Sequence, residues 1–271
     1  MGGPAAEVSF AAGLRLFLRP AHRAGTVRVA CDGTSTLGHV VQSLGVPLTE
    51  VGSLVANGGP VTPRYRPGSG DVVQVGALRR PQPVPAARFL LDVHLGALAR
   101  RLRLAGVDAA YTNNLDDDAL IERANDGQRV LLTQDRGLLR RRALWLGAYV
   151  YGAHPDAQFA DVLDRFAPQL APWTRCTTCN GLLRPVPKAE VAPLLQPGTR
   201  RTYQAFSRCQ ACGQVYWRGA HSRRLEALIA SAQHAVPGAT PTSSRARDAG
   251  ALGITPSGMR TQPTLAEPPG G

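Results

Sequence analysis

The sequence lacks any long hydrophobic run. No stretch approaches the roughly 18 consecutive apolar residues that are needed to cross a bilayer, although 44% of the 271 residues are hydrophobic. The first ten residues, MGGPAAEVSF, also lack the basic start and continuous apolar segment of a secretion signal. We therefore expect a cytoplasmic protein without membrane contact, and its length is enough for two domains of ordinary size.

Cysteine and lysine are both scarce. Five cysteines are too few for a disulfide framework in a chain of this length, and four of them form two Cys-x-x-Cys pairs, which indicate metal binding in a reducing compartment. Lys188 is the only lysine among 31 basic residues. This argues against an α/β phosphate-acceptor domain of the receiver type, because such domains use a strand-end lysine beside the phosphorylated aspartate.

The net charge of +12 is unevenly distributed along the chain. Residues 1–85 carry eight basic and four acidic groups, residues 86–165 carry eleven of each, and residues 166–232 carry nine basic and two acidic groups. A neutral, acid-rich segment beside a strongly basic one suits a polyanion that one part holds and another part acts on. The alternative is that the excess of arginine reflects coding bias and serves solubility.

Proline-rich and low-complexity segments divide the chain. Residues 79–87 (RRPQPVPAA) contain three prolines without hydrophobic periodicity and are predicted to form a stiff linker. Residues 233–271 contain almost no large apolar side chain, so we expect a disordered tail there. A linker of this kind predicts few contacts between the domains that it joins, so removal of residues 1–80 should leave the remainder soluble.

Residues 1–78 show the pattern of a small α+β domain. VSFAAGLRLFL, TVRVAC and DVVQVGAL are typical of strands, TLGHVVQSLG has apolar residues at helical spacing, and Asn57-Gly58-Gly59 indicates a hairpin. This order predicts a β-grasp (ubiquitin-like) domain. We expect it to regulate the protein or to bind a protein partner. It should not act as a sulfur carrier, because the last strand continues into the linker and no free Gly-Gly terminus follows it.

Strand and helix patterns alternate over residues 88–170. RFLLD, VDAAYT, RVLLT and AYVYG are typical of strands, and helices are predicted for LGALARRLRLAG, DDALIERAND, GLLRRRALWL and PDAQFADVLDRF. Such alternation predicts an α/β domain with a parallel sheet that is covered on both faces.

Aspartates follow the predicted strands of this α/β domain. Asp92 ends the first strand, Asp117 and Asp118 lie after the second, and Asp135 follows the third. These carboxylates should meet at the carboxyl edge of the sheet, where Mg²⁺ or Mn²⁺ would offset their repulsion and support phosphodiester hydrolysis. For Asp117 and Asp118 a role at the helix N-terminus competes with catalysis. Asp108 opens the second strand at the opposite edge, and we expect it to be solvated.

The four paired cysteines are Cys176, Cys179, Cys209 and Cys212. The 29 residues between the pairs, and the turn residues Asn180 and Gly213 after them, are typical of a zinc ribbon, predicted here over residues 171–232. Four thiolates favour a closed tetrahedral Zn²⁺ site. We expect a structural role for it, because no coordination position remains open for catalysis.

Arginines near the acidic and cysteine segments are candidates for RNA contacts. Arg100 and Arg103 lie on the helix after Asp92, and further arginines and aromatic residues surround the cysteines. Arginine and aromatic side chains together can bind phosphates and stack on bases. The competing interpretations are a solvated helix face and a ribbon core. The candidates around the cysteines are Arg200, Arg201 and Arg208.

The ordered motifs together resemble a known family. FLLDVHLGALARRLRLAGVDAAY, DDDALIERA, RVLLTQDRGLLRR, TRCTTCNGLLRPVP and RCQACGQVYWRGAH are similar to the Mut-seven C-terminal RNase family, a PIN-like nuclease module joined to a zinc ribbon, and the N-terminal residues resemble the ubiquitin-like domain often fused ahead of it. The resemblance implies a metal-dependent ribonuclease whose acids match Asp92, Asp117 and Asp135. The alternative is a noncatalytic RNA-binding or ribosome-associated adaptor.

Overall fold

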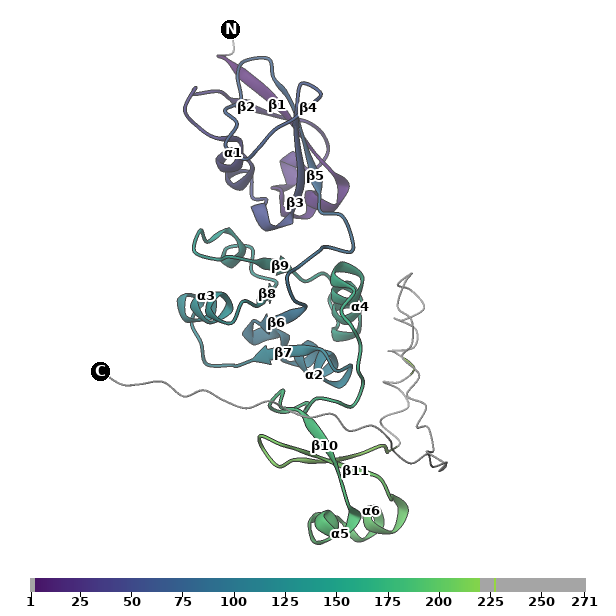
Figure 1. Ribbon diagram of the computed structural model, residues 1–271. Helices are drawn as coiled ribbons and strands as arrows, with labels where there is room; N and C mark the ends of the chain where they lie inside the picture. The colour runs from purple at the N-terminus through teal and green to yellow at the C-terminus, as the bar shows by residue number, and fades with distance from the viewer. Residues whose placement is uncertain (1–2, 220–226, 228–271) are drawn as a thin grey trace, which may run out of the picture. The chain divides into compact units, whose positions relative to one another are not determined.

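The computed structural model describes residues 3–219 and residue 227 (Figure 1). The predicted tail, 233–271, lies outside the described residues, as does nearly all of the predicted ribbon beyond residue 219. Three separate sheets form in the described part of the chain. No helix among these residues is both long enough and apolar enough to pass through a bilayer.

The N-terminal domain is a five-stranded sheet with one α-helix. Its elements are β1 (Ala5–Phe10), β2 (Val27–Ala30), α1 (Leu37–Ser43), β3 (Val51–Ala56), β4 (Gly59–Pro60) and β5 (Val72–Ala77). The strand order is β2-β1-β5-β3-β4, with β1 and β5 parallel at the centre. Helix α1 starts where the Thr36 hydroxyl accepts the His39 N–H, and it buries Leu37 and Val41 against the sheet. The β-grasp arrangement therefore agrees with the sequence pattern.

The first predicted strand is shorter than its sequence pattern suggested. Strand β1 ends at Phe10, and residues Ala12–Phe17 form a 3-10 helix. Leu14, Phe17 and Leu18 are all buried there. Their spacing of three and four residues matches a helical turn, so the turn buries all three on one side, which an extended strand could not do.

The α/β domain contains a four-stranded parallel sheet. Its elements are β6 (Arg88–Leu91), α2 (Gly96–Leu104), β7 (Asp108–Tyr111), α3 (Asp117–Asp126), β8 (Val130–Thr133), β9 (Gly147–Tyr149) and α4 (Pro155–Phe166). Successive strand residues face opposite sides: Phe89 packs in the cluster with α2 and α4, whereas Leu90 and Leu131 pack with α3. Helices α2 and α4 lie on one side of the sheet and α3 on the other (Figure 1). Both faces are thus covered, as the apolar strands require.

The strand order β7-β6-β8-β9 places a topological switch between β6 and β8. After β6 the chain adds β7 on one side, and it then returns to add β8 on the other side of β6. In open α/β sheets, ligands bind in the crevice at the carboxyl ends of the strands beside such a switch. The fold therefore points to the residues that directly follow β6 and β8.

The predicted helix over residues 137–146 is wrong. Only Leu138–Arg140 forms a 3-10 turn, and Arg141 is extended. Leu138, Leu139 and Leu144 are all buried in the cluster with α3. Residues spaced by one and six positions cannot lie on one face of an α-helix, so a turn followed by extended chain buries them better.

The C-terminal domain, here named the cysteine domain (residues 171–219), contains a three-stranded antiparallel sheet. Its elements are β10 (Leu183–Val186), α5 (Lys188–Val191), α6 (Pro197–Thr202), β11 (Phe206–Cys209) and β12 (Val215–Trp217). Val186, Val191 and Phe206 form its small core. A core of this size contributes too little free energy to stabilise a domain by itself. The four cysteines are therefore candidates for an additional source of stability.

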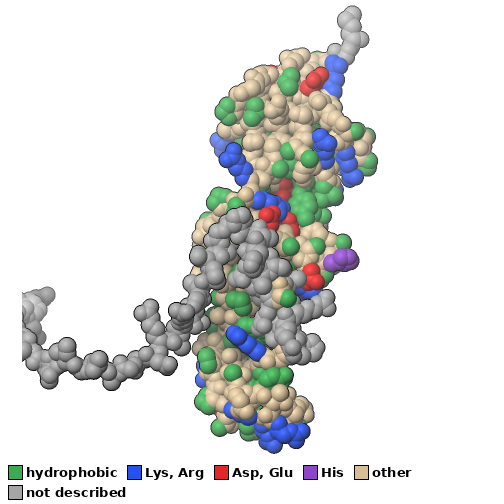
Figure 2. Space-filling model, turned by 90° about the vertical axis from the view of Figure 1, so that its right-hand side faces the viewer, with side chains coloured by type: hydrophobic (Ala, Val, Ile, Leu, Met, Phe, Trp, Pro, Cys, Tyr) green, Lys and Arg blue, Asp and Glu red, His purple; other side chains and the backbone are tan. Residues whose placement is uncertain are grey.

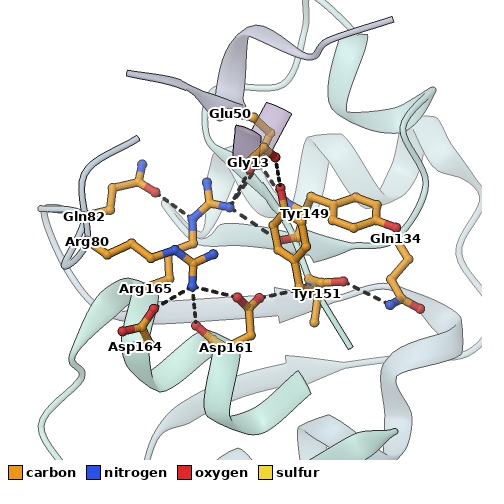
Figure 3. Close-up of polar contacts among 11 residues, drawn as sticks. Gly13, Glu50, Arg80, Gln82, Gln134, Tyr149, Tyr151, Asp161, Asp164 and Arg165 are labelled. Atoms are coloured by element: carbon orange, nitrogen blue, oxygen red, sulfur yellow. Dashed lines mark hydrogen bonds and ion pairs between the residues drawn. The ribbon is translucent and has the colours of Figure 1, made fainter. Parts of the chain in front are cut away.

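A buried ion pair joins the β-grasp domain to the α/β domain. Glu50 and Arg165 have side chains 4% and 2% exposed, and the Arg165 Nη1 lies 2.8 Å from the Glu50 Oε2 (Figure 3). The Glu50 Oε1 also accepts the N–H of Tyr149 at 2.8 Å. Burial raises the pKa of Glu50, although Arg165 opposes the shift. A side chain of the β-grasp domain thus satisfies a backbone donor at the edge strand β9.

Aromatic packing and the linker extend this interface. The rings of Phe17 and Tyr149 meet edge to face at 5.1 Å, and the Tyr151 hydroxyl donates to the Gly13 carbonyl. Arg80 in the linker binds both Asp161 and Asp164 on α4 (Figure 3). The expectation of few shared contacts across the linker is therefore wrong, because a proline-rich composition describes stiffness and says nothing about docking.

Glu50→Ala should lower the free energy of unfolding by about 3–5 kcal/mol, because it leaves the buried Arg165 without its countercharge. Urea unfolding of the full chain measures the loss. Glu7→Ala, which removes an exposed glutamate from β1, is the matched control and should change stability little. Equal stability of the Glu50→Ala and Glu7→Ala proteins would contradict the docked arrangement.

Candidate functional site

Two of the predicted acidic residues are joined through a buried threonine. The Thr133 hydroxyl, on the last residue of β8, donates to the Asp92 Oδ2 at 2.6 Å and accepts the Asp135 backbone N–H at 2.9 Å. Thr133 is completely buried, Asp92 is half-buried and Asp135 is exposed. This arrangement lies at the carboxyl ends of β6 and β8, beside the topological switch. Thr133 was not singled out by the sequence, where it reads only as the end of a strand.

Backbone N–H groups fix both carboxylates further. The Asp92 Oδ1 accepts the Val93 N–H at 2.6 Å. The Asp135 Oδ1 accepts the N–H groups of Gly137 and Leu138. The Asp135 Oδ2 makes no hydrogen bond to any described residue, so it remains available to a ligand. Each carboxylate is therefore held by backbone N–H groups of residues that follow its strand within a few positions.

The three consecutive aspartates, residues 116–118, differ in their hydrogen-bond and ion-pair partners. Asp116 is the N-cap of α3 and accepts the Ala119 N–H at 2.9 Å. Asp118 forms an ion pair with Arg141, whereas Asp117 has no hydrogen bond or ion pair within residues 3–219. Asp117 and Asp118 are both exposed in the first turn of the helix. Asp117 is thus the aspartate of the run without a structural partner.

The structure does not gather Asp92, Asp117 and Asp135 into one tight ligand set. Within residues 3–219, the four cysteines are the only group of three or more potential metal ligands whose donor atoms all lie within 4.8 Å of one another. The donor chemistry of the acids still suits Mg²⁺, which is commonly held by one or two carboxylates together with waters and substrate phosphates. Asp92 and Asp135, both contacted by Thr133, are the candidates for such a pair.

The four cysteines are brought together as predicted. Their Sγ atoms all lie within 4.8 Å of one another. Zinc bonds of about 2.3 Å in a tetrahedron place the sulfurs about 3.8 Å apart, so the set fits one such ion. Asn180 and Gly213, the turn residues after each pair, have positive φ angles of 70° and 77°. These angles let the chain reverse directly after the second sulfur of each pair.

The thiol of Cys176 is poised to lose its proton. Burial opposes ionisation, but hydrogen bonds, led by that of the Tyr216 hydroxyl at 3.0 Å, outweigh it and lower the pKa of Cys176 to about 6. Burial instead raises the pKa of Cys179 to about 12. Four thiols without a cation thus do not ionise together, whereas a metal ion binds them as thiolates.

The first cysteine pair is docked on the α/β domain by Arg103. Its guanidinium donates to the Ala109 carbonyl and to the carbonyls of Thr177 and Thr178, and its side chain is 3% exposed. The prediction that Arg103 contacts RNA is therefore wrong, because its donors face protein carbonyls in the interior. A burial of this kind depends on the neighbouring domain, which the helical pattern alone does not reveal.

Asp108 takes part in the same junction. Its carboxylate binds Arg129 at 2.6 Å, Arg175 at 3.5 Å and the Asn180 amide at 2.8 Å. Burial raises its pKa, but these hydrogen bonds and charges outweigh burial and hold the pKa below its usual value. The expectation of a solvated Asp108 is wrong. This junction lies at the amino end of β7, the edge opposite to that of Asp92 and Asp135.

Basic side chains gather at the tip of the cysteine domain that α5 and α6 form (Figure 2). Arg200 and Arg201 are exposed there. Arg208 on β11 is half-buried, donates to the Gly213 carbonyl and pairs with Glu190 at 3.5 Å. Arg100 on α2 is exposed. Four of the five arginines predicted to contact RNA thus retain at least part of their surface.

Two family models match the chain. One, described as the Mut7-C RNAse domain, matches residues 87–229, which is more than half of the chain, and the other, Mut7-C ubiquitin, matches residues 3–82. The chain belongs to the Mut7-C RNAse domain family. No curated protein and no solved structure matches it.

The Mut7-C match includes both candidate sites. Its span contains the joined Asp92 and Asp135 and all four cysteines, and the Mut7-C ubiquitin match contains Phe17 and Glu50 of the interface. Membership indicates nuclease activity at the level of the family. The resemblance stated from the sequence motifs is thereby confirmed for both parts of the chain.

Proposed function

We propose that this Mut7-C protein is a metal-dependent ribonuclease with a PIN-like domain that cleaves RNA at the carboxyl ends of β6 and β8. One observation carries the proposal: the Thr133 hydroxyl joins the Asp92 carboxylate to the Asp135 backbone N–H beside the topological switch of an RNase-family domain. Neither carboxylate forms an ion pair with any described residue, so the negative charge of each is available to a metal ion.

Asp92 and Asp135 would hold a Mg²⁺ or Mn²⁺ ion, and Asp117 would approach as a third carboxylate. Such an ion supplies charge neutralisation at the phosphodiester and lowers the pKa of a bound water. The chain itself orients the acids: Thr133 fixes the Asp92 Oδ2, and the N–H groups of Gly137 and Leu138 fix the Asp135 Oδ1. Asp118, paired with Arg141, acts as a supporting residue.

The cysteine domain would bind one structural Zn²⁺ through Cys176, Cys179, Cys209 and Cys212, as a zinc ribbon. A reducing compartment such as the cytoplasm keeps these thiols available. The exposed Arg200 and Arg201, with Arg208 and Arg100, would bind RNA phosphates. The β-grasp domain retains surface for a protein partner, although one part of it is covered by Tyr149 and Tyr151 of the same chain.

Cleavage of labelled RNA should require added Mg²⁺ or Mn²⁺ and stop with EDTA. Carboxylates repel the negatively charged phosphodiester, and only a bound cation makes the local electrostatic potential positive enough for RNA to approach. The purified full chain is incubated with RNA, and products are resolved by length. Adding Zn²⁺ alone should not restore cleavage, because the ribbon site offers no open coordination position. Binding of RNA without cleavage under any divalent cation would instead favour the adaptor.

A further inference from the structure

Four arginines lie in the seven residues that follow Asp135: Arg136, Arg140, Arg141 and Arg142. We propose that they form a phosphate-binding track, here named the arginine track. It holds the RNA backbone beside the acidic edge, by which we mean Asp92 and Asp135 at the carboxyl ends of β6 and β8. This inference rests on the proposed ribonuclease function and identifies the contacts nearest the cleaved bond.

The backbone of the arginine track is fixed by the fold. Leu138 and Leu139 are each 2% exposed and pack in the cluster with α3. The Asp135 carboxylate accepts the N–H groups of Gly137 and Leu138, so it anchors the start of the same segment. Arg140, Arg141 and Arg142 are exposed. The segment therefore starts on a short anchored turn at a candidate catalytic residue and then runs toward the end of α3, where the Ala143 carbonyl accepts the Asn125 amide.

Neighbouring elements hold two of the four guanidinium groups. The Arg136 Cζ lies 5.6 Å from the centre of the Phe17 ring, so the β-grasp domain contributes to the arginine track. Arg141 forms an ion pair with Asp118 in the first turn of α3. Groups that are already oriented lose less entropy when they bind a phosphate. Arg140 and Arg142 have no carboxylate partner among the described residues.

Three of the four arginines of the track have no carboxylate or carbonyl partner among the described residues, whereas most arginines elsewhere in the α/β domain have one. Of the eleven arginines from residue 88 to residue 165, six bind carboxylates or backbone carbonyls through their guanidinium groups. Three of the remaining five lie in the track. The five are Arg100, Arg123, Arg136, Arg140 and Arg142.

The cysteine domain packs against the edge of the sheet opposite to Asp92 and Asp135, so its arginines cannot bind the phosphates next to the cleaved bond. Its contacts with the α/β domain run through Arg103, Asp108 and Ala109, at the amino ends of the strands. Four strand residues rise about 13 Å, which separates this edge from Asp92 and Asp135. Phosphates that flank the cleaved bond therefore need cations at the carboxyl edge, and the ribbon arginines are left to bind more distant parts of the strand.

Salt-dependent binding tests the arginine track. Arg140→Ala/Arg142→Ala is introduced into the Asp92→Asn protein, and its affinity for labelled single-stranded RNA is measured by fluorescence anisotropy from low to high salt. Loss of two phosphate contacts should reduce the slope of log affinity against log salt by about 1.4. The matched control is Arg64→Ala/Arg123→Ala, which removes two exposed arginines without carboxylate partners in the described structure and should leave the slope unchanged.

The outcomes separate this inference from the proposed function. Equal slopes for the two double variants would overturn the arginine track, even if wild type cleaves RNA. A reduced slope with no cleavage by wild type would support the track and overturn the ribonuclease. In the cleaving protein, Arg140→Ala/Arg142→Ala should also slow cleavage at low RNA concentration, with an unchanged melting temperature because both side chains are exposed.

Discussion

Asp92→Asn should reduce RNA cleavage on the order of 10²–10⁴-fold, because it removes a carboxylate charge at the proposed metal and phosphodiester site. Asn keeps the size of the side chain and an oxygen that can accept the Val93 N–H, so the fold should be retained. Binding of RNA should stay equal or become tighter, since a repulsive charge is lost. Single-turnover assays with Mn²⁺ and anisotropy measure the two effects separately.

Asp126→Asn is the matched control for this prediction. Asp126 is an exposed acid at the last position of α3, so its replacement removes the same charge far from the strand ends of β6 and β8. Its cleavage rate should equal that of wild type. Should the Asp92→Asn protein, free of contaminating nuclease, cleave as fast as the Asp126→Asn protein, Asp92 and Asp135 are not the active site and RNA is cleaved elsewhere on the chain.

Thr133 extends the same prediction to a positioning residue. Thr133→Val keeps the buried volume but loses the hydroxyl that joins Asp92 to Asp135. We expect cleavage and metal affinity to fall by roughly 10–100-fold, as is typical when a group that orients metal ligands is removed. Thr133→Ser, which retains the hydroxyl, should restore most of both. Equal losses in the Val and Ser variants would assign Thr133 a packing role alone.

Cys209→Ser should abolish zinc binding and unfold the cysteine domain. Cys209 is buried at the end of β11, and the hydrophobic cluster of the domain has only three fully buried residues, so a bound Zn²⁺ would supply much of the folding free energy. Structural zinc sites contribute about 10–16 kcal/mol of apparent binding free energy in small zinc-binding peptides. Elemental analysis should fall from one zinc per chain to none, and limited proteolysis should cleave within residues 171–219.

Cys31→Ser provides the control for the cysteine prediction. Cys31 lies in the β-grasp domain, away from the four-cysteine set, and its thiol contacts the Gly68 carbonyl. Zinc content and protease resistance should match those of wild type. Protein purified without chelator that contains no zinc, yet resists proteolysis in residues 171–219, would overturn the structural zinc site.

The sequence by itself determined those features that depend on local patterns. Short continuous apolar runs placed β6 and β8, and the run of aspartates at 116–118 marked the start of α3, because strand burial and helix capping depend on a few neighbouring residues. The cysteine spacing likewise determined the four-sulfur cluster, since each pair needs only one turn with a positive φ angle after it.

Only the tertiary structure decided how distant residues are used. Thr133 joins Asp92 to Asp135 because β6 and β8 are neighbours across the switch, and Glu50 pairs with Arg165 across 115 positions of the chain. Arg103 lies three residues after Arg100 on the same helix, where the sequence alone would place both in solvent, but the docked cysteine pair buries Arg103. Burial of a charged group depends on which partners the packed domains bring to it, and a one-dimensional pattern contains no such information.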